Sequence, residues 1–268
     1  MIDTHVHLWD TARMRYAWLA DDARPIVEAD LRRWSDDGRR VVLVEAGVDT
    51  PDVAAETRWF SDLAATHPAV HGFVAAIDLL GPALGSRLDD LQRLPGFVGV
   101  RHLLQDTDLP ATRPAELSGA LGELARRGIV FDACVRAPQL GQLRRVAERA
   151  PGTVIVLDHM GKPPVGDPEA LDRWRRDLAR LADLPEVHCK LSGLPAECVD
   201  ADHLEAVVAP IVGEALGCFG PDRCLVGSDW PVSDPGFDWC SRVLGLVPDG
   251  DRRAVAETNA LTIYRRNR

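Results

Sequence analysis

The sequence predicts a single-domain α/β fold, a (β/α)8 TIM barrel, and three observations support this. The chain has 268 residues, 46% of them hydrophobic, which is close to the roughly 250 residues of a typical barrel. Short apolar runs recur along the chain and alternate with stretches of helical periodicity, the pattern of repeated strand–helix units. The sequence contains no GxGxxG or Walker loop, which would indicate a nucleotide-binding open sheet instead. We therefore expect residues 1–268 to form one barrel.

Eight short segments rich in β-branched and apolar residues are predicted as strands, and helices are expected between them. The predicted strands are residues 2–6, 41–45, 71–77, 97–101, 129–132, 154–157, 187–191 and 224–227. The predicted helices are residues 51–67, 86–94, 114–127, 139–150, 171–184, 203–216 and 252–265. Residues 10–38 are the longest stretch without a strand. In a barrel this stretch follows the first strand, at the face where long loops shape the substrate pocket.

Charge and composition narrow the classes of partner. The formal net charge is −10, which argues against nucleic acid or an anionic membrane surface, because both require a basic patch. No apolar run approaches the roughly 20 residues that cross a bilayer, and the opening segment MIDTHVHLWD does not resemble a secretory leader. The six cysteines form no CxxC pair, as is typical of buried reduced thiols. We expect a soluble, cytoplasmic protein with a small-molecule partner, and a homo-oligomer stays open.

Two histidines end the first predicted strand. Side chains alternate between the faces of a strand, so Asp3, His5 and His7 are expected on one face. Two histidines spaced in this way can converge on one metal ion, although such a pair is by itself a weak signal. Its position strengthens the signal, because charged or ionisable residues also end several other strands.

Those residues follow the fourth, sixth and eighth predicted strands. The carboxyl ends of barrel strands meet at one face, so the residues should share a pocket despite their separation in sequence. Alternation along the strands favours His159 and Asp229, whereas Asp158 is expected to point the other way. Arg101 and His102 cannot both point inward from a regular strand, and at least one is expected to reach the pocket from the loop.

Seven segments in order along the whole chain carry a family resemblance: IDTHVHLWD, VVLVEAG, GVRHLLQ, VIVLDHMGKPP, CKLSGL, LVGSDWPV and NALTIY. The chain resembles the amidohydrolase-related lactonase family of the amidohydrolase superfamily, which includes fuconolactonase-like sugar lactonases and dicarboxylate lactonases. The resemblance implies a (β/α)8 barrel that hydrolyses a lactone, and a place in carbohydrate metabolism. It also implies a catalytic centre and a set of pocket residues, with His5, His7, His159 and Asp229 in the centre and Arg101, His102 and Trp230 in the pocket.

The residue types permit a hydrolytic mechanism. Asp229 can act as general base and take a proton from the attacking water. The three histidines either bind one divalent metal together with Asp229 or donate hydrogen bonds directly to the developing oxyanion. Zinc suits three imidazoles and one carboxylate best, manganese is an alternative, and catalysis without a metal stays open. Arg101 can hold a substrate carboxylate in a bidentate grip.

One departure from the wider superfamily bears on the number of metal ions. Two-metal members need a bridging lysine or glutamate after the fourth strand and another histidine after the fifth. This chain has Arg101 and His102 at the first place and Asp132 and Cys134 at the second. A binuclear site is therefore not expected, and a mononuclear site or none fits better.

The substrate and the rival functions stay open. Lys190, Asp78, Glu45 and Arg136 could bind substrate hydroxyls or carboxylates, and could equally form salt bridges at the barrel rim. One alternative function is metal-dependent, non-oxidative decarboxylation of an aromatic or unsaturated acid. Another is a barrel that binds a sugar acid without converting it. The GKP that follows His159 and the CKLSGL segment favour a lactonase.

Overall fold

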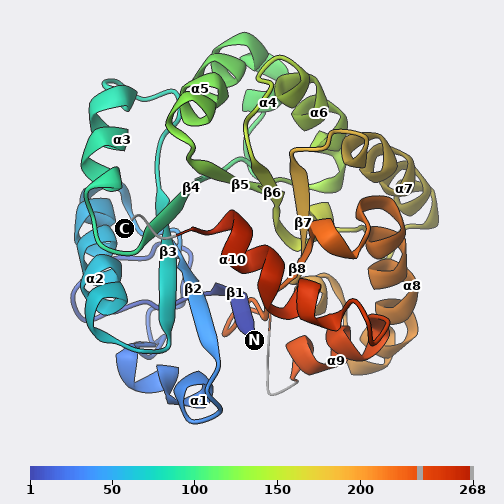
Figure 1. The fold of residues 1–268 in the computed structure, drawn as a ribbon, viewed down its shortest axis with the longest axis horizontal. Helices are drawn as coiled ribbons and strands as arrows, with labels where there is room; N and C mark the ends of the chain where they lie inside the picture. Colours follow the sequence, from blue (N-terminus) through green and yellow to red (C-terminus); the bar gives the residue numbers. More distant parts are fainter. Residues whose placement is uncertain (234–237, 266–268) are drawn as a thin grey trace.

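The computed structural model describes residues 1–233 and 238–265, and its centre is one sheet of eight parallel strands (Figure 1). Each strand pairs with the next along the chain, from the first to the eighth. This order confirms the predicted class; β1 and β7 have their predicted bounds, and the other six strands differ from theirs by one or two residues at an end. The strands are β1 Ile2–Val6, β2 Arg40–Val44, β3 Val70–Ala76, β4 Phe97–Leu103, β5 Val130–Cys134, β6 Ile155–Leu157, β7 Val187–Leu191 and β8 Cys224–Val226.

The segment after β8 joins the last strand to the first. The backbone N–H of Asp229 donates to the carbonyl of His5 at 2.8 Å, and the N–H of His7 donates to the carbonyl of Trp230 at 2.8 Å. Gly227 permits this approach, because a Cβ there would lie 2.8 Å from the Cβ of His5. The sheet therefore closes beside the two histidines and the aspartate.

A ring of helices surrounds the sheet (Figure 1). Six predicted helices agree with α2, α3 and α5 to α8 apart from shifted ends, and α9 follows the last strand where none was predicted. The predicted helix 252–265 is helical from residue 252 to residue 263, with a π-helical segment Ala254–Thr258 that leads into an α-helical turn Asn259–Ile263. The longer helices are α2 Val53–Thr66, α3 Leu84–Gln92, α5 Pro114–Arg127, α6 Leu140–Glu148, α7 Pro168–Ala182, α8 Ala201–Phe219 and α9 Trp239–Leu246, and the short ones are α1 Arg32–Ser35, α4 Leu109–Thr112 and α10 Asn259–Ile263.

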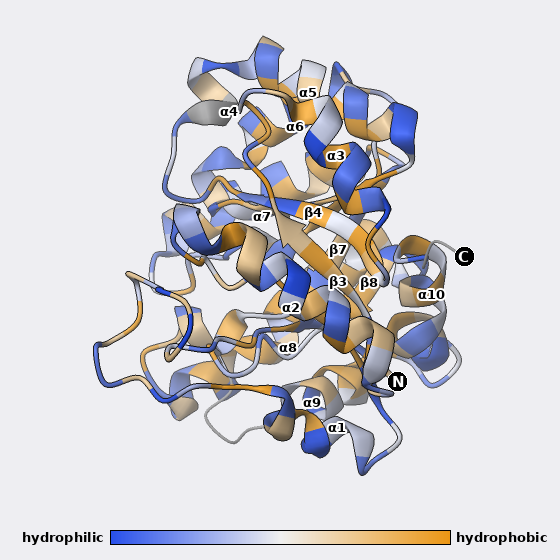
Figure 2. Cartoon of the chain, turned by 90° about the vertical axis from the view of Figure 1, so that its left-hand side faces the viewer, coloured by the Kyte–Doolittle hydropathy of each residue, from blue (hydrophilic) through white to orange (hydrophobic). Residues whose placement is uncertain are grey.

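Apolar side chains fill the space between strands and helices. A second apolar cluster, the inner cluster, fills the barrel at the amino-terminal ends of the strands. Hydrophobic residues dominate the strands, and hydrophilic residues recur on the outer helices (Figure 2). The inner cluster includes Val42, Val130 and Val156 from the strands, and Ile263 and Tyr264 at the end of α10. In Figure 1, α10 lies across the middle of the ring of strands. This end of the barrel is packed shut, which leaves the carboxyl ends of the strands for a site.

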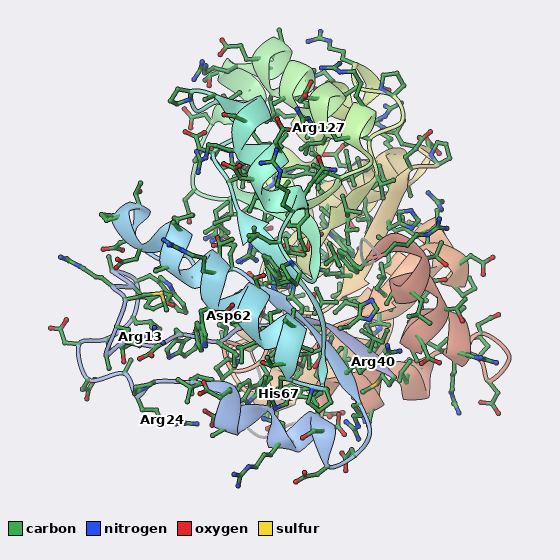
Figure 3. The ribbon with its side chains drawn as sticks, turned by 60° about the vertical axis from the view of Figure 1, so that its left-hand side comes forward. Arg13, Arg24, Arg40, Asp62, His67 and Arg127 are labelled. Carbon is green, nitrogen blue, oxygen red and sulfur yellow. The ribbon has the colours of Figure 1, made fainter. Side chains whose placement is uncertain are left out.

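The loop after β1 packs against the barrel and also projects from it. A two-residue bridge between Trp9 and Ile26 closes the loop, with N–H to carbonyl distances of 2.9 and 2.8 Å. Arg13 and Arg24, labelled in Figure 3, lie on the projecting part of this loop. In the described ranges, no helix combines the length and the apolar character that a bilayer crossing requires.

Candidate active site

A cavity of about 440 Å³ lies at the carboxyl ends of the strands. This is within the roughly 300–1,000 Å³ of small-molecule sites. Residues from several strand ends and from the loop after β1 form its walls. The polar and aromatic residues that line it are His7, Trp18, Asp49, Arg101, Gln105, Asp106, His159, Lys162 and Asp229.

Three potential metal ligands converge at the base of this cavity. The Nε2 atoms of His5 and His7 are 3.2 Å apart. The Oδ1 atom of Asp229 lies 3.6 Å from the first nitrogen and 3.3 Å from the second. Ligands about 2.1 Å from a tetrahedral zinc ion are separated by about 3.4 Å. The spacing of the three atoms therefore fits one divalent ion.

The hydrogen bonds behind these atoms also fit a metal. His7 Nδ1 lies 2.9 Å from the carbonyl oxygen of Val44, which can only accept, so Nδ1 carries the proton and Nε2 presents its lone pair. Asp158 Oδ1 lies 3.3 Å from His5 Nδ1, within ion-pair distance, and Lys190 Nζ lies 3.2 Å from the same nitrogen. The lone pair of His7 Nε2 therefore faces Nε2 of His5 and the carboxylate of Asp229. Arg101 Nη1 lies 3.3 Å from His5 Nε2 and does not contact His7 Nε2 at hydrogen-bond distance among the described contacts.

His159 completes the group from the opposite wall. Its Nε2 is 4.0 Å from Asp229 Oδ1, and its Nδ1 lies 2.9 Å from the hydroxyl of Ser192. Burial outweighs the neighbouring carboxylates of Asp229 and Asp158 and lowers the pKa of His159 to about 4, so the ring is neutral near pH 7. Gly193 packs against this ring, because a Cβ there would lie 2.3 Å from His159 Nδ1. The structure thus brings together all four residues that the resemblance implied for the centre.

Asp158 differs from its expected orientation. Val156 belongs to the inner cluster of the barrel, so alternation along β6 directs Asp158 inward as well. Asp158 contacts His5 and also lies 3.5 Å from Arg101 Nη1. His159 reaches the cavity because the chain leaves the strand after Leu157 and turns. The prediction that Asp158 points away is therefore wrong.

Asp3 also differs from its expected face. The pairing of β1 with β2 shifts register between Asp3 and Val6, which breaks the simple alternation. Asp3 accepts hydrogen bonds from Trp34 Nε1 at 3.0 Å and from the N–H of Ser228 at 2.8 Å. It stabilises the junction beside the site and does not join His5 and His7.

Lys190 lies beneath the histidines and is fully buried. Its Nζ is 2.5 Å from Asp132 Oδ2, 3.1 Å from Asp158 Oδ1 and 3.2 Å from His5 Nδ1. The hydroxyl of Tyr264 donates to the other oxygen of Asp132 at 2.7 Å. This arrangement supports His5 from below, and it does not favour the predicted contact between Lys190 and substrate.

Arg101 and His102 lie on opposite sides of β4: Arg101 is buried and lines the cavity, and His102 does not line it. The Nε and Nη2 atoms of Arg101 donate to the carboxylate and the carbonyl of Glu45, each at 2.5 Å. With Nη1 directed at His5 and Asp158, every guanidinium nitrogen has a protein partner. A bidentate grip on a substrate carboxylate would require these bonds to break. His102 Nδ1 instead accepts from the N–H of Leu79 at 3.3 Å.

The other pocket candidates serve local structure. Trp230 packs its ring edge against Trp34, with ring centres 5.3 Å apart. Asp78 accepts from the N–H of Leu80 at 3.0 Å in an exposed turn, and Arg136 pairs with Asp106 at 3.2 Å. Of the described residues, those that line the cavity do not include the pocket candidates His102, Trp230, Lys190 and Asp78.

Comparison with known proteins places the chain in a family. An amidohydrolase family model matches residues 2–266. The L-fucono-1,5-lactonase of Burkholderia multivorans is 34% identical over 255 residues, which cover 86% of this chain and 82% of that protein. The L-fucono-1,5-lactonase of Burkholderia ambifaria is 31% identical over an aligned length of 290 residues, covering 100% and 96%. A solved amidohydrolase from Burkholderia multivorans with bound zinc is 29% identical with a TM-score of 0.85, covering 99% of each chain. The chain therefore belongs to the amidohydrolase family of hydrolytic enzymes.

Proposed function

We propose that this protein is a lactonase that opens a sugar lactone at a site with one divalent metal. The observation that carries the proposal is the convergence of His5, His7 and Asp229 beneath a cavity of suitable size, with His159 on the opposite wall. The similarity to two enzymes named L-fucono-1,5-lactonase supports the lactone as substrate, and the zinc in a solved relative supports the metal.

The residues of the site can take separate roles in the hydrolysis of a lactone. A bound divalent ion would polarise the lactone carbonyl and make a water molecule more acidic. Burial alone would raise the pKa of Asp229, but the neighbouring histidines, His159 first, outweigh burial and hold this pKa well below its usual range. Asp229 is therefore ionised at neutral pH and can accept a proton from the attacking water, while Ser233 donates a hydrogen bond to its Oδ2. Neutral His159 can donate from Nε2 to the developing oxyanion.

The experiment combines metal removal with a substrate panel. The protein is stripped with a chelator and reloaded with zinc or with manganese, and acid release from sugar lactones and dicarboxylate lactones is followed with a pH indicator. We expect hydrolysis of a sugar lactone that disappears on stripping and returns on reloading. No hydrolysis across the panel, together with decarboxylation of an aromatic acid by the loaded protein, would overturn the proposal in favour of the decarboxylase alternative.

A further inference from the structure

Four consecutive residues after β6 adopt left-handed backbone conformations. The φ angles are 54° at His159, 54° at Met160, 71° at Gly161 and 53° at Lys162. The N–H of Lys162 donates to the carbonyl of His159 at 2.9 Å and closes the turn. L-residues disfavour this conformation, and such strain persists where the surrounding structure holds it in place.

The turn separates residues that pack from residues that face the cavity. Met160 is fully buried, and its carbonyl accepts from Trp174 Nε1 at 2.8 Å. A Cβ on Gly161 would lie 2.7 Å from Leu140 Cδ2, so this position also packs tightly. The two ends of the turn, His159 and Lys162, both line the cavity. The strained turn thus brings a lysine to the same pocket as a residue of the catalytic centre.

The ammonium group of Lys162 has donors available in that pocket. Its acidic neighbour Glu197 lies 4.0 Å away, at the limit of an ion pair. Within residues 1–233 and 238–265, Nζ makes no hydrogen bond, and the side chain is 17% exposed. Arg101 is the other lysine or arginine on the cavity wall, and its nitrogens are already occupied.

The acidic residues on the outer wall of the cavity do not offset this charge. Asp49 lies 3.1 Å from Arg15, and Asp106 lies 3.2 Å from Arg136, so each carboxylate is paired outside the cavity lining. An ammonium with unused donors favours an anionic oxygen group, because hydrogen bonds between ionised partners are stronger than neutral ones. A carboxylate is the anionic group that lactone hydrolysis produces.

We propose that Lys162 is the carboxylate-binding residue of this cavity. The carboxylate is either a substituent of the lactone or the acid group that forms when the ring opens. The proposal rests on the lactonase function for the source of the carboxylate, and on the geometry of the turn for the binding residue. It replaces the bidentate grip that the sequence predicted for Arg101.

Lys162→Met in the metal-loaded enzyme separates the two sources. Arg180→Met, which removes an exposed cation of α7, is the matched control. For a charged substituent, we expect KM for a carboxylate-bearing lactone to rise about tenfold while KM for a neutral lactone stays unchanged. For the ring-opened acid, we expect its inhibition constant to rise about tenfold instead. Lys162→Arg should restore part of either effect. If neither constant changes, the proposal is overturned.

Two further measurements test Lys162 without relying on turnover. Calorimetric titration of a sugar monoacid and a sugar diacid into metal-loaded wild type and Lys162→Met should show weaker binding of at least one acid to the variant. Equal affinity for both acids would overturn the proposal even if no lactone is hydrolysed. Lys162→Gly removes the side chain and the left-handed strain together, so its thermal midpoint should equal or exceed that of the wild type. A lower midpoint would show that the lysine stabilises the fold and would overturn the binding role.

Discussion

Gly193 offers a sharp test of the geometry at His159. The glycine has a φ of 69°, and an added Cβ would lie 2.3 Å from His159 Nδ1 and 2.5 Å from its Cγ. An ordinary contact between such atoms is about 3.4 Å, so Gly193→Ala must move the ring by about 1 Å. A displacement of about 1 Å at a catalytic group can cost about 100-fold in rate. We expect kcat/KM for the lactone to fall by about this factor.

Gly128→Ala is the matched control for backbone strain. Gly128 ends α5 with a φ of 64°, and an added Cβ would have no atom within 4 Å. Both alanines incur the left-handed penalty of about 1–2 kcal/mol, and only the alanine at 193 displaces a histidine. Urea unfolding measures the first effect and steady-state kinetics the second. If Gly193→Ala loses no more activity than Gly128→Ala, the packing argument for His159 is refuted.

Three other perturbations test the ligand cluster and the buried acids. Asp229→Asn should reduce kcat by about 1,000-fold or more, because it removes both the general base and a metal ligand. The control Asp106→Asn, on the outer wall of the cavity, should change kcat by less than about threefold. Similar losses in both variants would argue against the role of Asp229. Zinc at about 100 times its Kd should stabilise the wild type by about 2.7 kcal/mol in chemical unfolding, and His7→Ala should lose most of this gain. Burial, and then the charge of Glu45, raise the pKa of Glu56 from 4.5 to about 8, so between these pH values the native state binds one more proton than the unfolded state. The free energy of unfolding should therefore fall as pH rises across this window, by an amount on the order of 5 kcal/mol. Glu56→Gln should flatten the profile of unfolding free energy against pH, and superimposable profiles would contradict the buried protonated acid.

The barrel and its catalytic centre could be predicted from the sequence because both depend on features that recur locally. Apolar runs indicate strands, and a closed parallel barrel brings the ends of those strands together. His5, His7, His159 and Asp229 meet for this reason, although Asp229 is 224 positions from His5. The same logic does not specify which atoms a side chain reaches once the strand has ended.

Lys162 and Arg101 show where that limit lies. Three of the four residues in the turn at 159–162 are not glycine, so local propensity argues against the left-handed conformation that directs Lys162 into the cavity. Lys162 is one of only two lysines in the chain, which is the one feature of the sequence that sets it apart. Arg101 is held by Glu45, which directly follows β2 and lies 56 positions earlier. No local sequence pattern indicates the direction of Lys162 or the pairing of Arg101 with Glu45.

The buried charges around the centre bear on whether a metal is needed. In the part of the chain that the structure describes, four buried carboxylates surround two buried cations, so the cluster is two positive charges short of neutrality. The six residues are Glu45, Asp132, Asp158 and Asp229 with Arg101 and Lys190. Uncompensated buried charge is costly, and it must be balanced by an ion or by bound protons.

Protons on the histidines are a poor source of that charge. Burial outweighs the neighbouring carboxylates and lowers the pKa of His5 well below its ordinary value and that of His159 to about 4. Both rings therefore resist protonation near pH 7. One divalent cation between His5, His7 and Asp229 would supply the two missing charges at the point where the three ligand atoms converge. The charge balance thus favours a metal-dependent hydrolase over the metal-free mechanism that the sequence left open.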